Sequence, residues 1–179
     1  MYEELKEDLY ESCFCEKEDF LLDRAHDGDI DAMYVLATLY YEDGQSNSAY
    51  EWFYKAAEQG QADATYYLGI FYWHPTGLGV VDPNNAKAIE YYLKAAELGS
   101  AMAMCELGWQ YRQGTEAVEK NEAKALELFE QAAELGYHKA FSWLAKCYKF
   151  GNGVEVNLEK SLEYAEKAYD ALNEEYLFS

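Results

Sequence analysis

The chain has 179 residues, half of them hydrophobic and 17% aromatic, with 18 tyrosines and four tryptophans. This length and composition favour one domain with a continuous apolar core. Fourteen basic against 34 acidic side chains give a formal charge of −20, which argues against binding to nucleic acid or to an anionic membrane. The acidity serves either solubility alone or attraction of a basic partner.

The predicted elements are helices in pairs, starting with an acidic amphipathic helix over residues 2–12 and a second helix over 16–27. The next pairs are 31–43 with 47–59, 62–73 with 84–98, 101–113 with 121–135, and 138–149 with 157–172. Expected N-caps are Asp82, with Pro83 in the first turn of its helix, and Asn121 and Asn157 in the later pairs. The tail, 173–179, extends the last helix, docks on it or frays.

One pattern recurs four times, in the first helix of each pair from residue 30 onward. It consists of Ala, Leu, a small residue and Tyr at spacings of 4, 1 and 3, as in Ala64, Leu68, Gly69 and Tyr72. These spacings place all four residues on one side of a helix. The small residue lets a neighbouring helix approach closely. A Gly four residues before each Ala, such as Gly60, suits a left-handed helix cap. The period predicts a helical solenoid.

These residues resemble the Sel-one-like repeat (SLR) family, relatives of the tetratricopeptide repeat. Residues 62–99 match the family pattern almost throughout, whereas 30–60 have a shorter turn without its Gly-x-Gly-Val element. The resemblance implies an all-α fold, an α/α superhelical solenoid of antiparallel helix pairs, as a single domain over 1–179. Its parts are a degenerate N-terminal repeat or cap (1–29), four repeats (30–61, 62–100, 101–137 and 138–172) and the tail.

In tetratricopeptide-like arrays the first helix of each repeat lines the concave surface, and the resemblance carries this geometry over. The corresponding positions here hold an aromatic strip with basic residues at one end, the residue types that dominate interface hot spots. The predicted partner-binding residues are Tyr34, Tyr41, Tyr66, Trp73, Trp109, Arg112, Lys146 and Lys149. The alternative is that the aromatic side chains pack between repeats and the lysines balance nearby glutamates.

We therefore expect a non-enzymatic scaffold that binds a peptide or protein partner in its concave groove, with the cations facing a carboxylate. The alternative hypothesis is an acidic immunity or inhibitor protein that neutralises a basic toxin or effector. Self-association through an uncovered end repeat is also open.

No motif marks a catalytic, metal or cofactor site, and we expect no enzyme. The three histidines lack metal-ligand spacing, and Gly77-Leu-Gly79 is a repeat turn with no phosphate-loop Lys-Ser/Thr after it. Family members linked to β-lactam binding or hydrolysis resemble a secreted branch with a disulfide in each repeat.

The four cysteines, Cys13, Cys15, Cys105 and Cys147, lack the regular pairing of that branch, so we expect free thiols in a reducing compartment. The charged start of the chain has no apolar signal-peptide core, and no run of about 18 apolar residues occurs. We expect a cytoplasmic protein.

Overall fold

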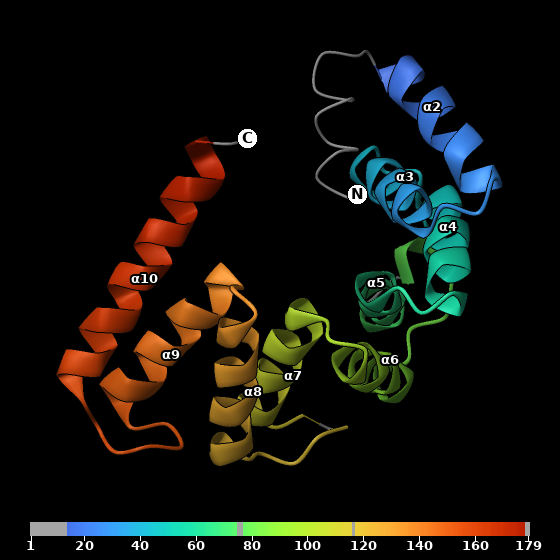
Figure 1. The fold of residues 1–179 in the computed structure, drawn as a ribbon. Coiled ribbons are helices and arrows are strands. Elements are labelled where there is room, and N and C mark those ends of the chain that lie inside the picture. The colour runs from blue at the N-terminus through green and yellow to red at the C-terminus, as the bar shows by residue number, and fades with distance from the viewer. Residues whose placement is uncertain (1–13, 75–76, 116, 178–179) are drawn as a thin grey trace. The chain divides into compact units, whose positions relative to one another are not determined.

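A computed structural model describes the backbone of residues 14–74, 77–115 and 117–177, and most of it is helical (Figure 1). Within these ranges, the regular structure outside α-helices is a short 3₁₀ turn, Gly77–Gly79, and an isolated bridge between Thr115 and Val118. The contacts of the chain group into two compact units, Met1–Leu98 (unit 1) and Gly99–Ser179 (unit 2). The predicted helix over 2–12 lies outside the described residues.

Each described helix packs against the next one within its unit. Unit 1 holds α2 (Phe14–His26), α3 (Ile30–Glu42), α4 (Ser46–Glu58), α5 (Ala62–Trp73) and α6 (Asn85–Glu97). Unit 2 holds α7 (Ala101–Gln113), α8 (Glu122–Glu134), α9 (His138–Phe150) and α10 (Leu158–Leu177). The predicted all-α class, an α/α solenoid built of paired helices, is thus confirmed.

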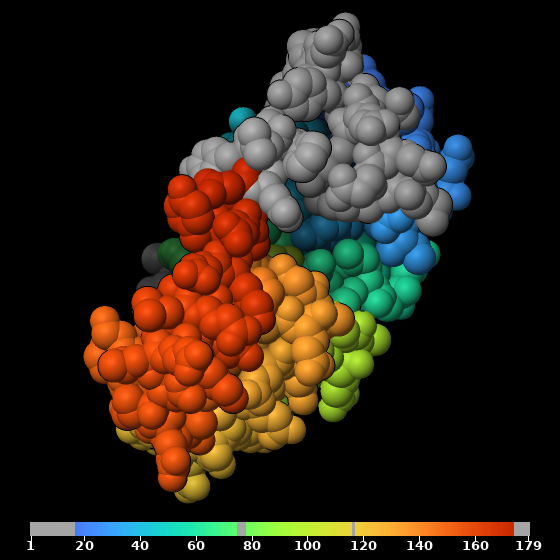
Figure 2. Space-filling model, turned by 60° about the vertical axis from the view of Figure 1, so that its left-hand side comes forward, coloured from blue at the N-terminus to red at the C-terminus, as the bar shows by residue number. Residues whose placement is uncertain are grey.

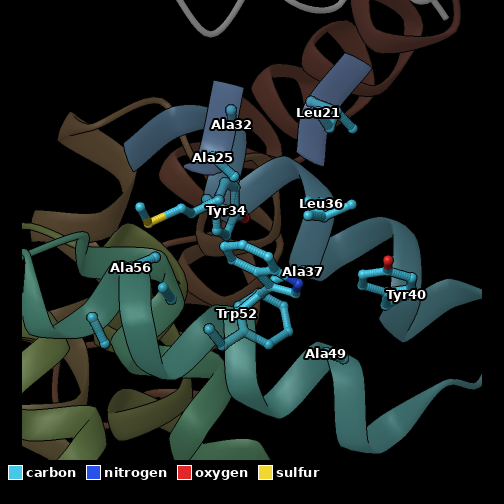
Figure 3. Close-up of a cluster of buried hydrophobic side chains, with 14 of the residues drawn as sticks. Leu21, Ala25, Ala32, Tyr34, Leu36, Ala37, Tyr40, Ala49, Trp52 and Ala56 are labelled. Atoms are coloured by element: carbon cyan, nitrogen blue, oxygen red, sulfur yellow. The ribbon is translucent and has the colours of Figure 1, made fainter. Parts of the chain in front are cut away.

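The repeated Ala and Leu form the core of each unit, as their spacing predicted. In unit 1 they join Leu21 of α2 and Phe53 of α4, and Figure 3 shows the part of this cluster contributed by α2, α3 and α4. In unit 2 Leu144 packs with Phe129 and Cys147. Full burial of one such side chain stabilises a fold by roughly 1.5–3 kcal/mol, so the repeated positions hold the hairpins together.

The predicted N-caps at Asn121 and Asn157 are confirmed, because each side-chain oxygen accepts a backbone N–H three residues later at 3.0 Å. The prediction at Asp82 was wrong. The N-cap of α6 is Asn84, whose Oδ1 accepts the N–H of Lys87 at 3.0 Å. At the C-terminal end of unit 2, α10 continues to Leu177, so the tail extends the last helix through that residue.

The residue that caps the second helix of each hairpin also closes the hairpin. Its backbone N–H donates to the carbonyl oxygen of the repeated Tyr in the first helix. The four bonds are Gln45 to Tyr40 (2.8 Å), Asn84 to Tyr72 (2.8 Å), Asn121 to Tyr111 (2.7 Å) and Asn157 to Tyr148 (2.8 Å). The Tyr72 and Tyr111 hydroxyls accept from Lys87 and Lys124, at 2.8 and 2.7 Å. The Tyr and Lys of the repeat pattern therefore have a structural role in these two hairpins.

The small residue after the repeated Leu faces an aromatic ring of the paired helix. A Cβ at Gly69 would lie 2.5 Å from Cε1 of Tyr92, and one at Gly108 would lie 2.6 Å from Cε1 of Phe129. Both rings are fully buried and cannot move aside. Glycine is therefore required at these two positions by the close approach of the helices.

We expect Gly69→Ala to lower the free energy of unfolding by about 1–2 kcal/mol. Overpacking against Tyr92 costs about 1–3 kcal/mol, and the better helix propensity of alanine returns up to about 1 kcal/mol. Urea denaturation of the single variants and of the pair with Tyr92→Leu tests the cause. The Gly69→Ala penalty should shrink when the ring is absent, and an equal penalty in both backgrounds would contradict the clash.

Candidate partner-binding site

The predicted anchors of unit 1 lie around an aromatic cluster centred on Phe53. Tyr34 is only 8% exposed, and its ring centroid lies 6.1 Å from that of Phe53. Tyr41 is half-buried against Phe53 and Phe71, and burial raises the pKa of its hydroxyl. Tyr66 is half-buried, with its ring 5.5 Å from that of Tyr92.

This burial requires a correction for Tyr34, which we predicted to contact a partner. Its ring fills the core between α3, α4 and α5 and presents almost no surface to another molecule. Tyr41 and Tyr66 contribute to the same packing with part of each ring. Trp73, the last residue of α5, is half-buried, and among the described residues it has no ring or cation contact. Trp73 is therefore the most available aromatic anchor of the four in unit 1.

In unit 2 an aromatic ring and two cations contact Trp143 of α9, a residue that was not among the predicted partner-binding residues. One face of its ring stacks on Phe129 of α8, with centroids 5.6 Å apart and planes 10° apart. The Nζ of Lys146 lies 4.2 Å from the Trp143 centroid, and the guanidinium carbon of Arg112 lies 5.5 Å from it. Two cations from two helices are thus held against one indole ring, which attracts each of them.

Among the described residues, no close ion pair joins a cation of this region to a carboxylate, although Arg112 lies near enough to Glu122 to contribute to the lowering of its pKa. Lys139, Lys146 and Lys149 each lie over an aromatic ring of α9 or the residue before it, and α9 contains no acidic residue. The Nε of Arg112 is buried and donates to no acceptor within the described part of the chain. By contrast, Lys120 and Lys167 form ion pairs with glutamates at 2.7 and 2.9 Å. Among the described residues, Lys139, Lys146 and Lys149 thus form no ion pair of this kind with a glutamate.

Trp143 occupies the third position after the repeated Ala140, and Tyr67 occupies the same position after Ala64. Both rings stack on an aromatic residue of the preceding helix, Tyr67 on Phe53 at 4.4 Å and Trp143 on Phe129 at 5.6 Å. The same position holds Val35 and Glu106 in the other two repeats, so an alignment of the repeats alone would not have selected it. The predicted Trp109 is half-buried on α7, three residues before Arg112 and so on the same side of the helix.

The described residues contain no group of three or more His, Cys, Asp or Glu side chains that could hold a metal ion. Cys105 and Cys147 are free thiols, as predicted, and both are buried, whereas the side chains of Cys13 and Cys15 lie outside the described residues. Burial raises the pKa of Cys105 to about 12 and that of Cys147 to about 11, so neither thiol is an activated nucleophile.

In the part of the chain that the structure describes, no helix is both long and apolar enough to cross a membrane.

A family model for the Sel1 repeat matches residues 30–61, 62–100, 101–137 and 138–171. The chain belongs to the Sel1 repeat family. The first three matched repeats have the predicted bounds, and the fourth ends one residue earlier than predicted. Sel1 repeat proteins generally act as scaffolds for protein–protein interaction and are typically non-enzymatic.

Two solved structures with this repeat are similar to the chain. One is c5321, a protective antigen of uropathogenic Escherichia coli with an SLR fold, at 30% identity and a TM-score of 0.71 over 86% of this chain and 33% of that one. The other is a Sel1 repeat protein from Oxalobacter formigenes, at 29% identity and a TM-score of 0.75 over 88% and 64%. The chain thus spans a third and slightly less than two thirds of their lengths. A search among curated proteins finds no match.

Proposed function

We propose that this Sel1 repeat protein is a binding scaffold whose unit 2 holds an acidic segment or a C-terminal carboxylate of a protein partner. The site is the face around Trp143, formed by the end of α7 and by α9. The observation that carries the proposal is the group of cations there that form no close ion pair among the described residues, in a chain whose net charge is −20. A scaffold with so negative a field needs such a local positive region before it can accept an anionic ligand.

The indole ring positions these cations. Lys146 and Arg112 lie against Trp143, which restricts their motion before a ligand arrives and lowers the entropy lost on binding. The guanidinium can donate two parallel hydrogen bonds to a carboxylate, and the ammonium supplies a second charge. Trp109, on α7 of the same unit, is the proposed apolar anchor for the rest of the bound segment.

The test measures binding of a fluorescent Glu-rich peptide, with a free and with an amidated C-terminus, by anisotropy. We expect Lys146→Glu to weaken binding by roughly tenfold, equivalent to about 1.4 kcal/mol, since the exchange replaces attraction with repulsion. Lys94→Glu is the matched control. Lys94 is an exposed lysine of α6 in unit 1, and its substitution changes the net charge by the same amount.

The control should leave the affinity within about twofold of the unchanged protein. Failure of the Glu-rich peptide to bind, or an equal loss in Lys94→Glu and Lys146→Glu, would reject the proposed site. A lower affinity for the amidated peptide would identify the terminal carboxylate as the group recognised. Equal affinity for both peptides would identify the acidic side chains instead.

A second candidate function is neutralisation of a basic toxin or effector, and the observation in its favour is the net charge of −20. A complex of this kind should form quickly at low salt and weaken steeply as salt is added. A cognate partner that is neutral or acidic would remove this candidate.

A further inference from the structure

The last helix carries an apolar stripe on a face that does not pack against the rest of unit 2. Leu162 and Tyr169 are 66% and 67% exposed, unusually high values for large apolar side chains. Figure 2 shows α10, in red, along the surface of this unit. The whole stripe consists of Leu158, Leu162, Ala165, Tyr169 and Leu172, all exposed.

The packed face of α10 is a different one. Ser161 and Ala168 are buried, and the Ser161 hydroxyl donates to the carbonyl oxygen of Ala145 at 2.8 Å. Tyr164 stacks on Tyr148 of α9 with ring centroids 5.7 Å apart. The exposed stripe is therefore additional to the residues that fix α10 in the fold.

The stripe has the spacing of a helix-pairing seam. Its members follow one another at intervals of 4, 3, 4 and 3 residues, which is the a/d repeat of a coiled coil. From Leu158 to Leu172 it runs about 21 Å at 1.5 Å per residue, or about four helical turns. A hollow of about 390 Å³ lies along the stripe and is lined by Leu162, Ala165 and Tyr169 together with two acidic residues, so it has room for side chains of a partner helix.

The charge beside the stripe is of one sign. Glu166 and Asp170 line the hollow. Glu159 lies two helical turns before Glu166, on the same flank of the stripe. None of these three has an ion-pair partner among the described residues, whereas the neighbouring Glu163 is paired with Lys167 at 2.9 Å. A ligand for this face must therefore match an apolar seam flanked by unpaired carboxylates.

We infer that the exposed face of α10 docks an amphipathic helix of a partner protein, with apolar residues at 3,4 spacing and Lys or Arg along one flank. The carboxylates favour this occupant over a second copy of the chain, which would bring another acidic flank and a further net charge of −20. Apolar packing supplies the affinity, and the acidic flank sets the orientation and the choice of partner. This surface is separate from the one around Trp143 and requires ligands of the opposite charge.

The test uses two designed helical peptides with the same Leu seam, one with Lys and one with Glu on the flanking positions. The Lys-flanked peptide should bind the full chain, and the Glu-flanked peptide should not. Leu162→Glu and Glu166→Lys should each weaken binding at least roughly tenfold. Both side chains are exposed, so the helical circular dichroism of these variants should match that of the unchanged protein. Glu134→Lys is the control, an exposed glutamate of α8 in the same unit that undergoes the same charge change.

Equal binding of the two peptides, or an equal loss in Glu134→Lys, would overturn the assignment of the acidic flank. Sedimentation of the chain alone tests the competing occupant: a dimer that Leu162→Glu dissociates would assign the face to a second copy. Lys146→Glu should leave binding of the Lys-flanked peptide unchanged, because Lys146 belongs to the face around Trp143. Failure of the α10 proposal is therefore distinguishable from failure of the proposed function.

Discussion

Replacing Phe53 with alanine is expected to lower the free energy of unfolding by about 3–5 kcal/mol, enough to unfold a marginally stable domain. The Phe53 ring is fully buried in α4 and stacks on Tyr67 at 4.4 Å with the planes 5° apart. Tyr34, Tyr41 and Phe71 surround it with centroids 6.1, 6.3 and 6.5 Å away. These rings belong to α3 and α5, so the cavity left by the substitution cannot close without moving two helices.

The adjacent Tyr54 provides the matched control, because it is 43% exposed and points about 100° around α4 from Phe53. Tyr54→Ala removes an aromatic ring of the same size class but should cost less than about 1 kcal/mol. Urea denaturation followed by circular dichroism measures both variants. A Phe53→Ala penalty no larger than that of Tyr54→Ala would mean that the aromatic cluster does not carry the stability of unit 1.

The sequence predicted the helices well because the repeat pattern marks both the buried face and the turns. It failed at the start of α6, where Asp82 and Pro83 matched the usual signals for a cap. The capping residue must also donate its backbone N–H to the carbonyl oxygen of Tyr72, and Asn84 is the residue that reaches it, at 2.8 Å. That requirement comes from the shape of the closed hairpin, which local sequence signals do not contain.

The candidate site was harder to predict for a similar reason. Periodicity identifies the face on which Tyr34 lies, but the rings that cover that face come from α4 and α5. Trp143 was missed because the same repeat position holds Tyr67, Val35 and Glu106 in the other repeats, so no single residue type marks it. A count of charged residues also does not show which of them are paired. Lys87 and Lys124 donate hydrogen bonds to tyrosines, whereas Lys146 lies over Trp143 and forms no ion pair among the described residues.

The second large effect is expected for Gly153→Ala, in the turn between α9 and α10. Gly153 has a φ of +75°, and a Cβ there would lie 2.6 Å from the carbonyl carbon of Glu122 and 2.9 Å from the nitrogen of Ala123. Both atoms are backbone of the first turn of α8, so a rotamer change cannot relieve the clash. The backbone N–H of Gly153 also bonds to Glu122, whose pKa is lowered mainly by its hydrogen bond from Lys120. The turn therefore ties the last hairpin to α8.

Two costs add in this variant. A left-handed backbone costs a residue with a Cβ about 1–2 kcal/mol, and overpacking against fixed atoms adds about 1–3 kcal/mol. We expect a loss in the free energy of unfolding of about 2–5 kcal/mol, measured by chemical denaturation. Gly136→Ala separates the two costs, because Gly136 lies in the same unit at a φ of +82° with no atom within 4 Å of the added Cβ. The free energy of unfolding of Gly136→Ala should fall only by the cost of the left-handed backbone, about 1–2 kcal/mol. Equal losses in the two variants would show that the contact with α8 yields under the substitution and does not fix the position of the last hairpin.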